Sequence, residues 1–182
     1  MTSHAVSTQE ASRPLAVKLA AALAGALVVA AAAQVSIPIP GSPVPFTLQP
    51  MAVLIVGGLL GARYGALSLA MYLAMGAAGL PVFAPFGAPG LARLIGPTGG
   101  FLIAYPFAAA TVGALAGGSY RRHALAALAG MAVIFAGGLS QLAILGLPLA
   151  IGITPFAAAD LVKVLLAALL VRRFHSTTRA LR

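Results

Sequence analysis

The chain has 182 residues, of which 61% are hydrophobic and only 7% are charged, and its mean hydropathy is +1.05. Soluble domains carry about 25% charged residues, so the composition excludes a water-soluble fold and predicts an all-α polytopic membrane protein. The sequence contains no cysteine, which excludes disulfides and thiolate chemistry. The formal net charge is +9. Its basic residues lie in ones and twos between apolar runs, which is typical of topology signals and does not predict a nucleic-acid partner.

Six apolar runs follow a polar segment, 1–14, that we expect to be a disordered cytoplasmic tail. The bilayer core requires ~20 apolar residues per helix. Residues 15–175 thus predict a single six-helix transmembrane domain, and 176–182 a basic cytoplasmic tail. The predicted spans are 15–34, 48–60, 64–78, 99–116, 124–145 and 154–171.

Two boundaries leave alternatives. The alanine-rich end of the first run resembles a signal-peptidase site, but the run is longer than the apolar region of a signal peptide. The second and third runs are short and can form one broken helix. We favour two spans with a tight cytoplasmic turn at 61–63, because a lone arginine stands there between glycines.

The basic residues predict the orientation. With six spans both termini lie on one side, and nine of the 11 Lys and Arg residues fall at that side. Arg93 alone lies in an outer loop, the proline- and glycine-rich connection 79–98, and Lys163 lies in a span. The positive-inside rule therefore predicts cytoplasmic termini.

The last span holds Asp160, the only acidic residue outside the N-terminal tail, and Lys163. Three residues are close to one helical turn, so both side chains leave the same face. A charge in hydrocarbon costs roughly 2.5–3.5 kcal/mol on insertion scales, and such residues are functional by default. With Arg93 above them, they predict an outward-opening cavity for a small solute with an anionic group and a hydrogen-bond donor. The alternatives are a structural ion pair and, for Arg93, a lipid headgroup anchor.

Enzymatic and metal sites find no support. No histidine lies near Ser68 or Ser140 to activate a nucleophile, and the chain has no Walker motif. His4, His123 and His175 are far apart in tails or turns. We therefore expect a protein that is not an enzyme, with no catalytic residue and no metal.

The first span carries small residues, Ala16, Ala20 and Ala24, at a spacing of four. Such a face lets another helix approach closely. It can pack inside the bundle or dock a partner subunit, and the spacing does not separate the two.

Five motifs, taken in order, resemble one family. They are PVPFTLQ at 43–49, LLGARYG at 59–65, GAAGLPVFA at 76–84, GPTGG at 96–100 and DLVK at 160–163. Together they resemble BioY, the biotin-binding substrate component of energy-coupling-factor transporters. The resemblance extends from the first helix to the sixth.

The resemblance implies a six-helix subunit of the bacterial cytoplasmic membrane that binds biotin from outside, with biotin as transported ligand and no cofactor. It implies docking through the first helix onto a transmembrane coupling protein with two ABC-type ATPases. Some members lack a dedicated module. A self-sufficient small transporter, as a homo-oligomer coupled to protons through Asp160, is therefore the alternative, and a structural scaffold is the third class.

Asp160, Lys163 and Arg93 resemble the polar ligand contacts of the family. Our hypothesis gives the valerate carboxylate to Lys163 and Arg93 and the ureido N–H groups to Asp160. The reverse arrangement, with Asp160 mainly orienting Lys163, stays open. An apolar wall and lesser polar contacts are predicted at Phe46, Tyr72, Val82, Phe83, Thr47, Gln49 and Thr98. Phe101 departs from the tyrosine expected after GPTGG.

Overall fold

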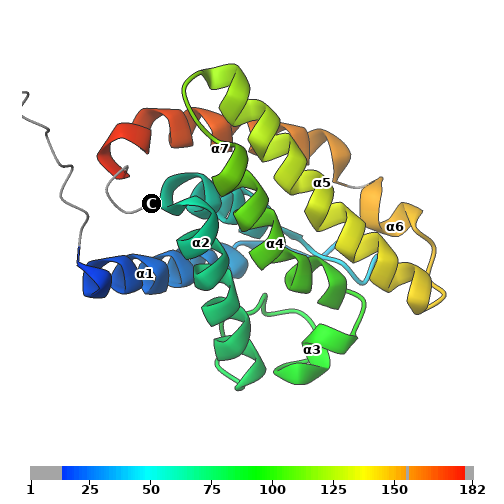
Figure 1. Cartoon of the computed structure of the whole chain (residues 1–182). Coiled ribbons are helices and arrows are strands. Elements are labelled where there is room, and N and C mark those ends of the chain that lie inside the picture. Colours follow the sequence, from blue (N-terminus) through cyan, green and yellow to red (C-terminus); the bar gives the residue numbers. More distant parts are fainter. Residues whose placement is uncertain (1–13, 155, 179–182) are drawn as a thin grey trace, which may run out of the picture.

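The fold is a bundle of helices with one small hairpin, and a computed structural model describes residues 14–154 and 156–178 (Figure 1). This confirms the predicted all-α class. Two short strands form an antiparallel pair in which Ser36 faces Thr47. The elements are α1 (Leu15–Gln34), β1 (Ser36–Ile37), β2 (Phe46–Thr47), α2 (Gln49–Ala77), α3 (Leu91–Ile95), α4 (Gly99–Leu115), α5 (Tyr120–Ile144), α6 (Ala150–Ile153) and α7 (Ala157–Thr178).

α2 covers the two predicted spans 48–60 and 64–78 and is broken between them. Gly61 has φ 78° and ψ 177°, which is not helical, and glycine adopts a positive φ without steric cost. Gly113 of α4 lies against this break. A Cβ on Gly113 would stand 2.3 Å from the Gly61 carbonyl carbon and from the Ala62 nitrogen. The close approach of α4 therefore depends on a glycine.

The last predicted span, 154–171, differs from the structure at both ends. α6 is a separate short helix, and α7 begins at Ala157 and continues to Thr178. The sequence has a proline between α6 and α7, and proline lacks the amide that a continuous helix requires. At the C-terminal end, the predicted span stops at 171 because the hydropathy falls at Arg172. The helix nevertheless continues to Thr178, because charged residues end an apolar run without ending a helix.

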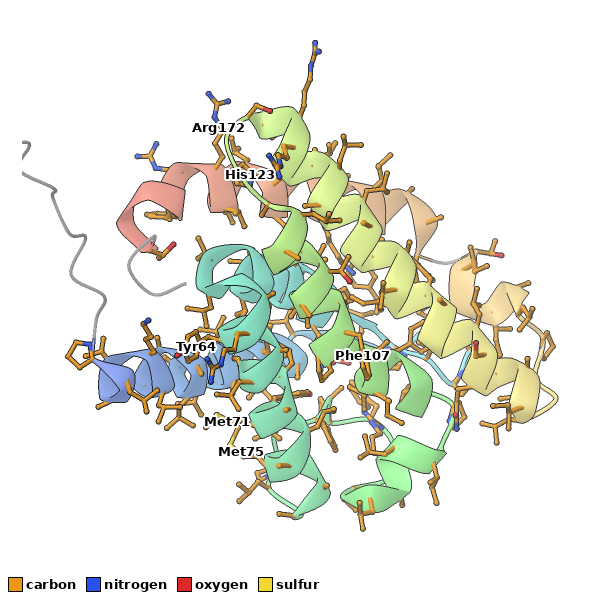
Figure 2. The ribbon with its side chains drawn as sticks, viewed as in Figure 1. Tyr64, Met71, Met75, Phe107, His123 and Arg172 are labelled. Carbon is orange, nitrogen blue, oxygen red and sulfur yellow. The ribbon has the colours of Figure 1, made fainter. Side chains whose placement is uncertain are left out.

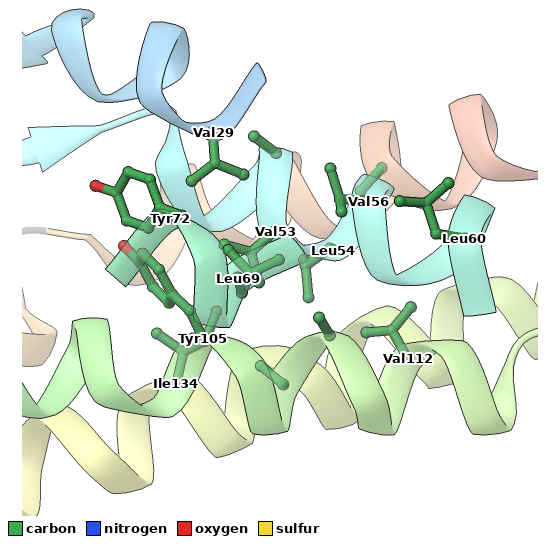
Figure 3. Packing of buried hydrophobic residues seen from close by; sticks show 14 of the residues in the cluster. Val29, Val53, Leu54, Val56, Leu60, Leu69, Tyr72, Tyr105, Val112 and Ile134 are labelled. Atoms are coloured by element: carbon green, nitrogen blue, oxygen red, sulfur yellow. The ribbon is translucent and has the colours of Figure 1, made fainter. Parts of the chain in front are cut away.

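Small residues bring the helices together. A Cβ on Gly57 of α2 would lie 2.5 Å from the Ala109 carbonyl of α4, and one on Gly137 of α5 would lie 2.6 Å from the Gly100 carbonyl. Close approach through glycine and alanine is how helices associate in lipid. Larger side chains, among them Leu69, fill the centre between α2, α4 and α5 (Figure 3).

Four helical segments of the described chain are long and apolar enough to cross a membrane. α4 is apolar but has only 17 residues. Leucine and valine side chains on the outer faces are exposed, as lipid contact requires. Figure 2 shows His123 and Arg172 at the upper end of the molecule, away from α3. The spans are Leu15–Gln34, Gln49–Ala77, Tyr120–Ile144 and Ala150–Phe174.

Candidate ligand-binding site

Asp160 and Lys163 form a buried ion pair near the start of α7. The Lys163 Nζ lies 2.7 Å from the Asp160 Oδ1 and donates a second hydrogen bond, also 2.7 Å, to the Thr47 carbonyl. It stands 3.8 Å from the centre of the Phe46 ring, a cation–π contact. The prediction that Asp160 and Lys163 leave the same face of their helix is confirmed. The pair ties α7 to β2.

Asp160 lies in the first turn of α7. The N-terminal end of a helix carries partial positive charge, so a carboxylate is stabilised there. At 1.5 Å per residue, Asp160 and Lys163 lie about 4.5 and 9 Å along the axis from Ala157. Both are therefore closer to the helix end than the predicted start at Thr154 implied.

Arg93 is buried in the short helix α3 and is held by its own loop. Its Nη2 donates to the Ala84 carbonyl at 2.8 Å, and its Nη1 donates to the Phe86 carbonyl. Gly87 has φ +118°, and a Cβ on it would lie 1.8 Å from Nη1. Burial lowers the pKa of Arg93, but a guanidinium stays charged in proteins. Within the described residues, the only acid is Asp160, and that acid is paired with Lys163.

The ion pair and Arg93 line the same cavity, which has an empty volume of about 610 Å³ including its open mouth. Small-molecule sites are largely apolar with a few polar groups, and the lining of this cavity has that composition. The polar lining comprises Thr47, Gln49, Arg93, Thr98, Asp160 and Lys163. The rest is mostly apolar and includes Val44, Pro45, Phe101, Leu102, Tyr105, Met131, Ile134, Phe135 and Phe156.

The predicted aromatic wall lies behind the cavity surface. Phe46 supports Lys163 and stacks with Phe156 at 6.4 Å between ring centres. Tyr72 is fully buried and its hydroxyl accepts a 2.6 Å hydrogen bond from the Gln49 Nε2. Phe83 packs edge-on against Tyr72 at 5.5 Å. None of Phe46, Tyr72 and Phe83 is among the lining residues, and the same holds for Val82.

The aromatic lining was missed from the sequence at Phe101, Tyr105, Phe135 and Phe156. Phe101 and Tyr105 are four residues apart, so they share one face of α4, directly after the GPTGG motif. That spacing is the sequence signal from which both residues could have been predicted to line the cavity. Phe156 lies outside any helix, and nothing in its local sequence marked it.

A second cavity adjoins the first at Arg93. It lies between the connection that follows β1 and the segment that carries α3. The two cavities share Pro45, Arg93 and Thr98. Arg93 therefore stands at the boundary between the two cavities.

The alanines predicted to dock a partner, Ala16, Ala20 and Ala24, are all exposed on α1. The buried face of α1 is a different set, formed by Ala22, Gly25, Ala26, Val29, Ala30 and Ala33. The three alanines are thus left uncovered by the rest of the bundle.

The sequence profile of the BioY family matches residues 3–180. The chain belongs to the BioY family. A BioY relative described as a biotin transporter, from Thermotoga maritima, is 39% identical over 143 residues, which cover 75% of this chain and 84% of that protein. A probable biotin transporter BioY of Pyrococcus horikoshii is 40% identical over 149 residues, covering 80% and 88%.

A solved structure has the same fold as this BioY chain. It is a crystal structure of the S-component for biotin from an ECF-type ABC transporter, with a TM-score of 0.79 at 28% identity. The alignment covers 88% of this chain and 92% of that chain. The predicted fold, that of a six-helix substrate component, is confirmed.

Proposed function

We propose that this chain captures biotin in the cavity lined by Asp160, Lys163 and Arg93 and is the substrate-binding component of a biotin transporter. The observation that carries the proposal is the meeting of three buried charges in one apolar cavity of a BioY-family chain. Biotin offers a carboxylate, a urea and an aliphatic chain, which match the charged and apolar parts of the lining. The curated relatives are transporters, which supports the prediction that the chain is not an enzyme.

We extend the proposal to the partners and the membrane. The S-component of known structure comes from an ECF-type ABC transporter, which supports docking onto a transmembrane coupling protein with two ABC-type ATPases. The exposed Ala16, Ala20 and Ala24 on α1 are the proposed contact. The basic residues at the end away from α3 support cytoplasmic termini, because positive charge marks the cytoplasmic side.

Calorimetric titration of biotin into the purified protein in detergent tests the site. We expect binding by the wild type and loss of binding in Asp160→Asn and Lys163→Met. The matched controls are Glu10→Gln, which changes the only other acid, and Lys18→Met, whose lysine lies over the Tyr64 ring. Both controls should bind as the wild type does. A folded wild type that binds no biotin contradicts the proposal.

The energy source is tested separately, by uptake of labelled biotin into proteoliposomes. With the coupling protein and ATPases present, uptake should require ATP. Uptake by the chain alone, driven by a pH gradient and abolished when the gradient is collapsed, would instead support the self-sufficient transporter.

A further inference from the structure

Two basic side chains from different helices share one aromatic ring where α1 meets α2. The Lys18 Nζ lies 5.6 Å from the centre of the Tyr64 ring, and the Arg63 Cζ lies 5.7 Å from it (Figure 2). Both distances fall within the range of a cation–π contact. The ring is only 8% exposed, whereas Arg63 is exposed and Lys18 is half-buried. A fixed ring therefore holds two cations that a ligand can reach.

The fold places this cluster at the tip of a helical hairpin. A Cβ on Gly65 would lie 2.9 Å from the Cα of Gly57. These residues would be about 12 Å apart along a straight helix, so the two halves of α2 fold back on each other at the non-helical Gly61. Arg63 and Tyr64 follow that break directly. The tip of a hairpin with two apolar halves lies where the hydrocarbon ends and the lipid headgroups begin.

The two cations lack a counter-charge in the part of the chain that the structure describes. The only acid there is Asp160, and it is paired with Lys163 in the ligand cavity. Two like charges on one ring repel each other, and an anion bound between them reverses the sign of that interaction. Arg63 presents the planar donor fork that matches a phosphate, and Lys18 adds an ammonium, which also binds phosphate. The cluster is therefore suited to a phosphate group.

An apolar row continues from Lys18 along the surface of α1. Leu15, Leu19 and Leu23 are 61%, 43% and 42% exposed, and their spacing of four aligns them on one side of the helix. Leu15 is also a surface neighbour of Lys18, three residues away. A ligand that contacts the cations and this row has an anionic group joined to a long apolar chain. Anionic membrane lipids have this chemistry, and basic residues at the membrane surface attract them.

We propose that Lys18 and Arg63, held by Tyr64, bind the phosphate of an anionic phospholipid whose acyl chain lies along the leucine row of α1. Each basic residue near a membrane surface contributes about a fivefold preference for anionic lipid, so the two together should give about 30-fold. The site is separate from the ligand cavity. The proposal therefore does not depend on whether the chain binds biotin.

Native mass spectrometry of the full chain in detergent tests the site, with phosphatidylglycerol and phosphatidylcholine titrated separately. The wild type should bind one phosphatidylglycerol about 30-fold more tightly than one phosphatidylcholine. Lys18→Met and Arg63→Met should each reduce this preference to about fivefold, and the double variant should abolish it. The matched control is Arg121→Met, which removes an exposed arginine of α5 and should keep the preference. Biotin binding should be unchanged in all four variants, which checks that they are folded.

The aromatic ring is tested with all charges in place. Tyr64→Phe keeps the ring and should keep the preference, whereas Tyr64→Leu should reduce it. Equal losses in Arg121→Met and Arg63→Met overturn the proposal, because the preference then reflects the overall positive charge of the chain. Displacement of phosphatidylglycerol by an equal concentration of inorganic phosphate also overturns it, because a free anion then suffices without the apolar row. An unchanged preference in the Lys18→Met/Arg63→Met double variant excludes the site.

Discussion

Lys163→Met should destabilise the fold as well as the site. Methionine is close to lysine in length and is flexible enough to fill the same space, so the main change is loss of the ammonium. Asp160 is then left buried without its counter-charge, and the Thr47 carbonyl loses its donor. Removing one partner of a buried ion pair costs roughly 3–5 kcal/mol. For a chain of this size, 1 kcal/mol shifts the Tm by roughly 2–4 °C, so the Tm should fall by roughly 6–20 °C.

The double variant Asp160→Leu/Lys163→Met distinguishes a lost charge from a lost contact. Replacing both partners with apolar side chains of similar shape is often neutral or stabilising, so the double variant should melt close to the wild type and still bind no biotin. The chain has no tryptophan, so unfolding is best followed by circular dichroism of the helices. Lys18→Met, the control, loses one cation–π contact worth about 1 kcal/mol. A double variant as unstable as Lys163→Met would refute the reasoning.

Three further substitutions test other parts of the structure. Gly87→Ala places a Cβ against the Arg93 guanidinium at a positive φ, so it should weaken biotin binding about 10- to 100-fold in titrations. Unchanged biotin affinity would contradict the placement of Arg93. Gly137→Leu should separate α5 from α4 and lower the Tm. The control, Ala132→Leu on the exposed side of α5, should leave the Tm unchanged. Equal Tm values for the two variants would argue against the close packing of α4 and α5. Phe83→Ala should lower the free energy of unfolding by about 3–5 kcal/mol in thermal unfolding. An unchanged stability would indicate that the Phe83 ring does not hold its loop against α2.

The sequence predicted the class and the charged centre because both depend on strong local signals. Long apolar runs exclude water, and their length matches a bilayer. Asp160 and Lys163 are prominent because a charge is costly where the neighbours are leucine and valine, and their spacing determines that they meet. The first helix was assigned to the same residues, Leu15–Gln34, that α1 spans.

The remaining features depend on three-dimensional contacts that no periodic pattern in the sequence contains. The Thr47 carbonyl accepts from Lys163 across 116 positions of sequence. Arg93 turns toward its own loop because Gly87 leaves room for it. Phe83 was expected in the ligand wall and lies behind it, because the missing side chain of Gly76 opens a space that its ring fills. Steric complementarity of this kind is decided by the assembled bundle.

The small β1–β2 ladder joins the ligand cavity to the helix proposed for docking. Thr47, which accepts the hydrogen bond from Lys163, pairs with Ser36, and Ser36 lies two residues after the end of α1. A ligand that changes the Lys163–Thr47 bond therefore acts on the segment that fixes the end of α1. Thermodynamic linkage requires reciprocity: if biotin alters the affinity of α1 for a partner, that partner alters the affinity for biotin by the same factor. The change in biotin affinity on docking and the change in partner affinity on biotin binding then measure the same coupling free energy.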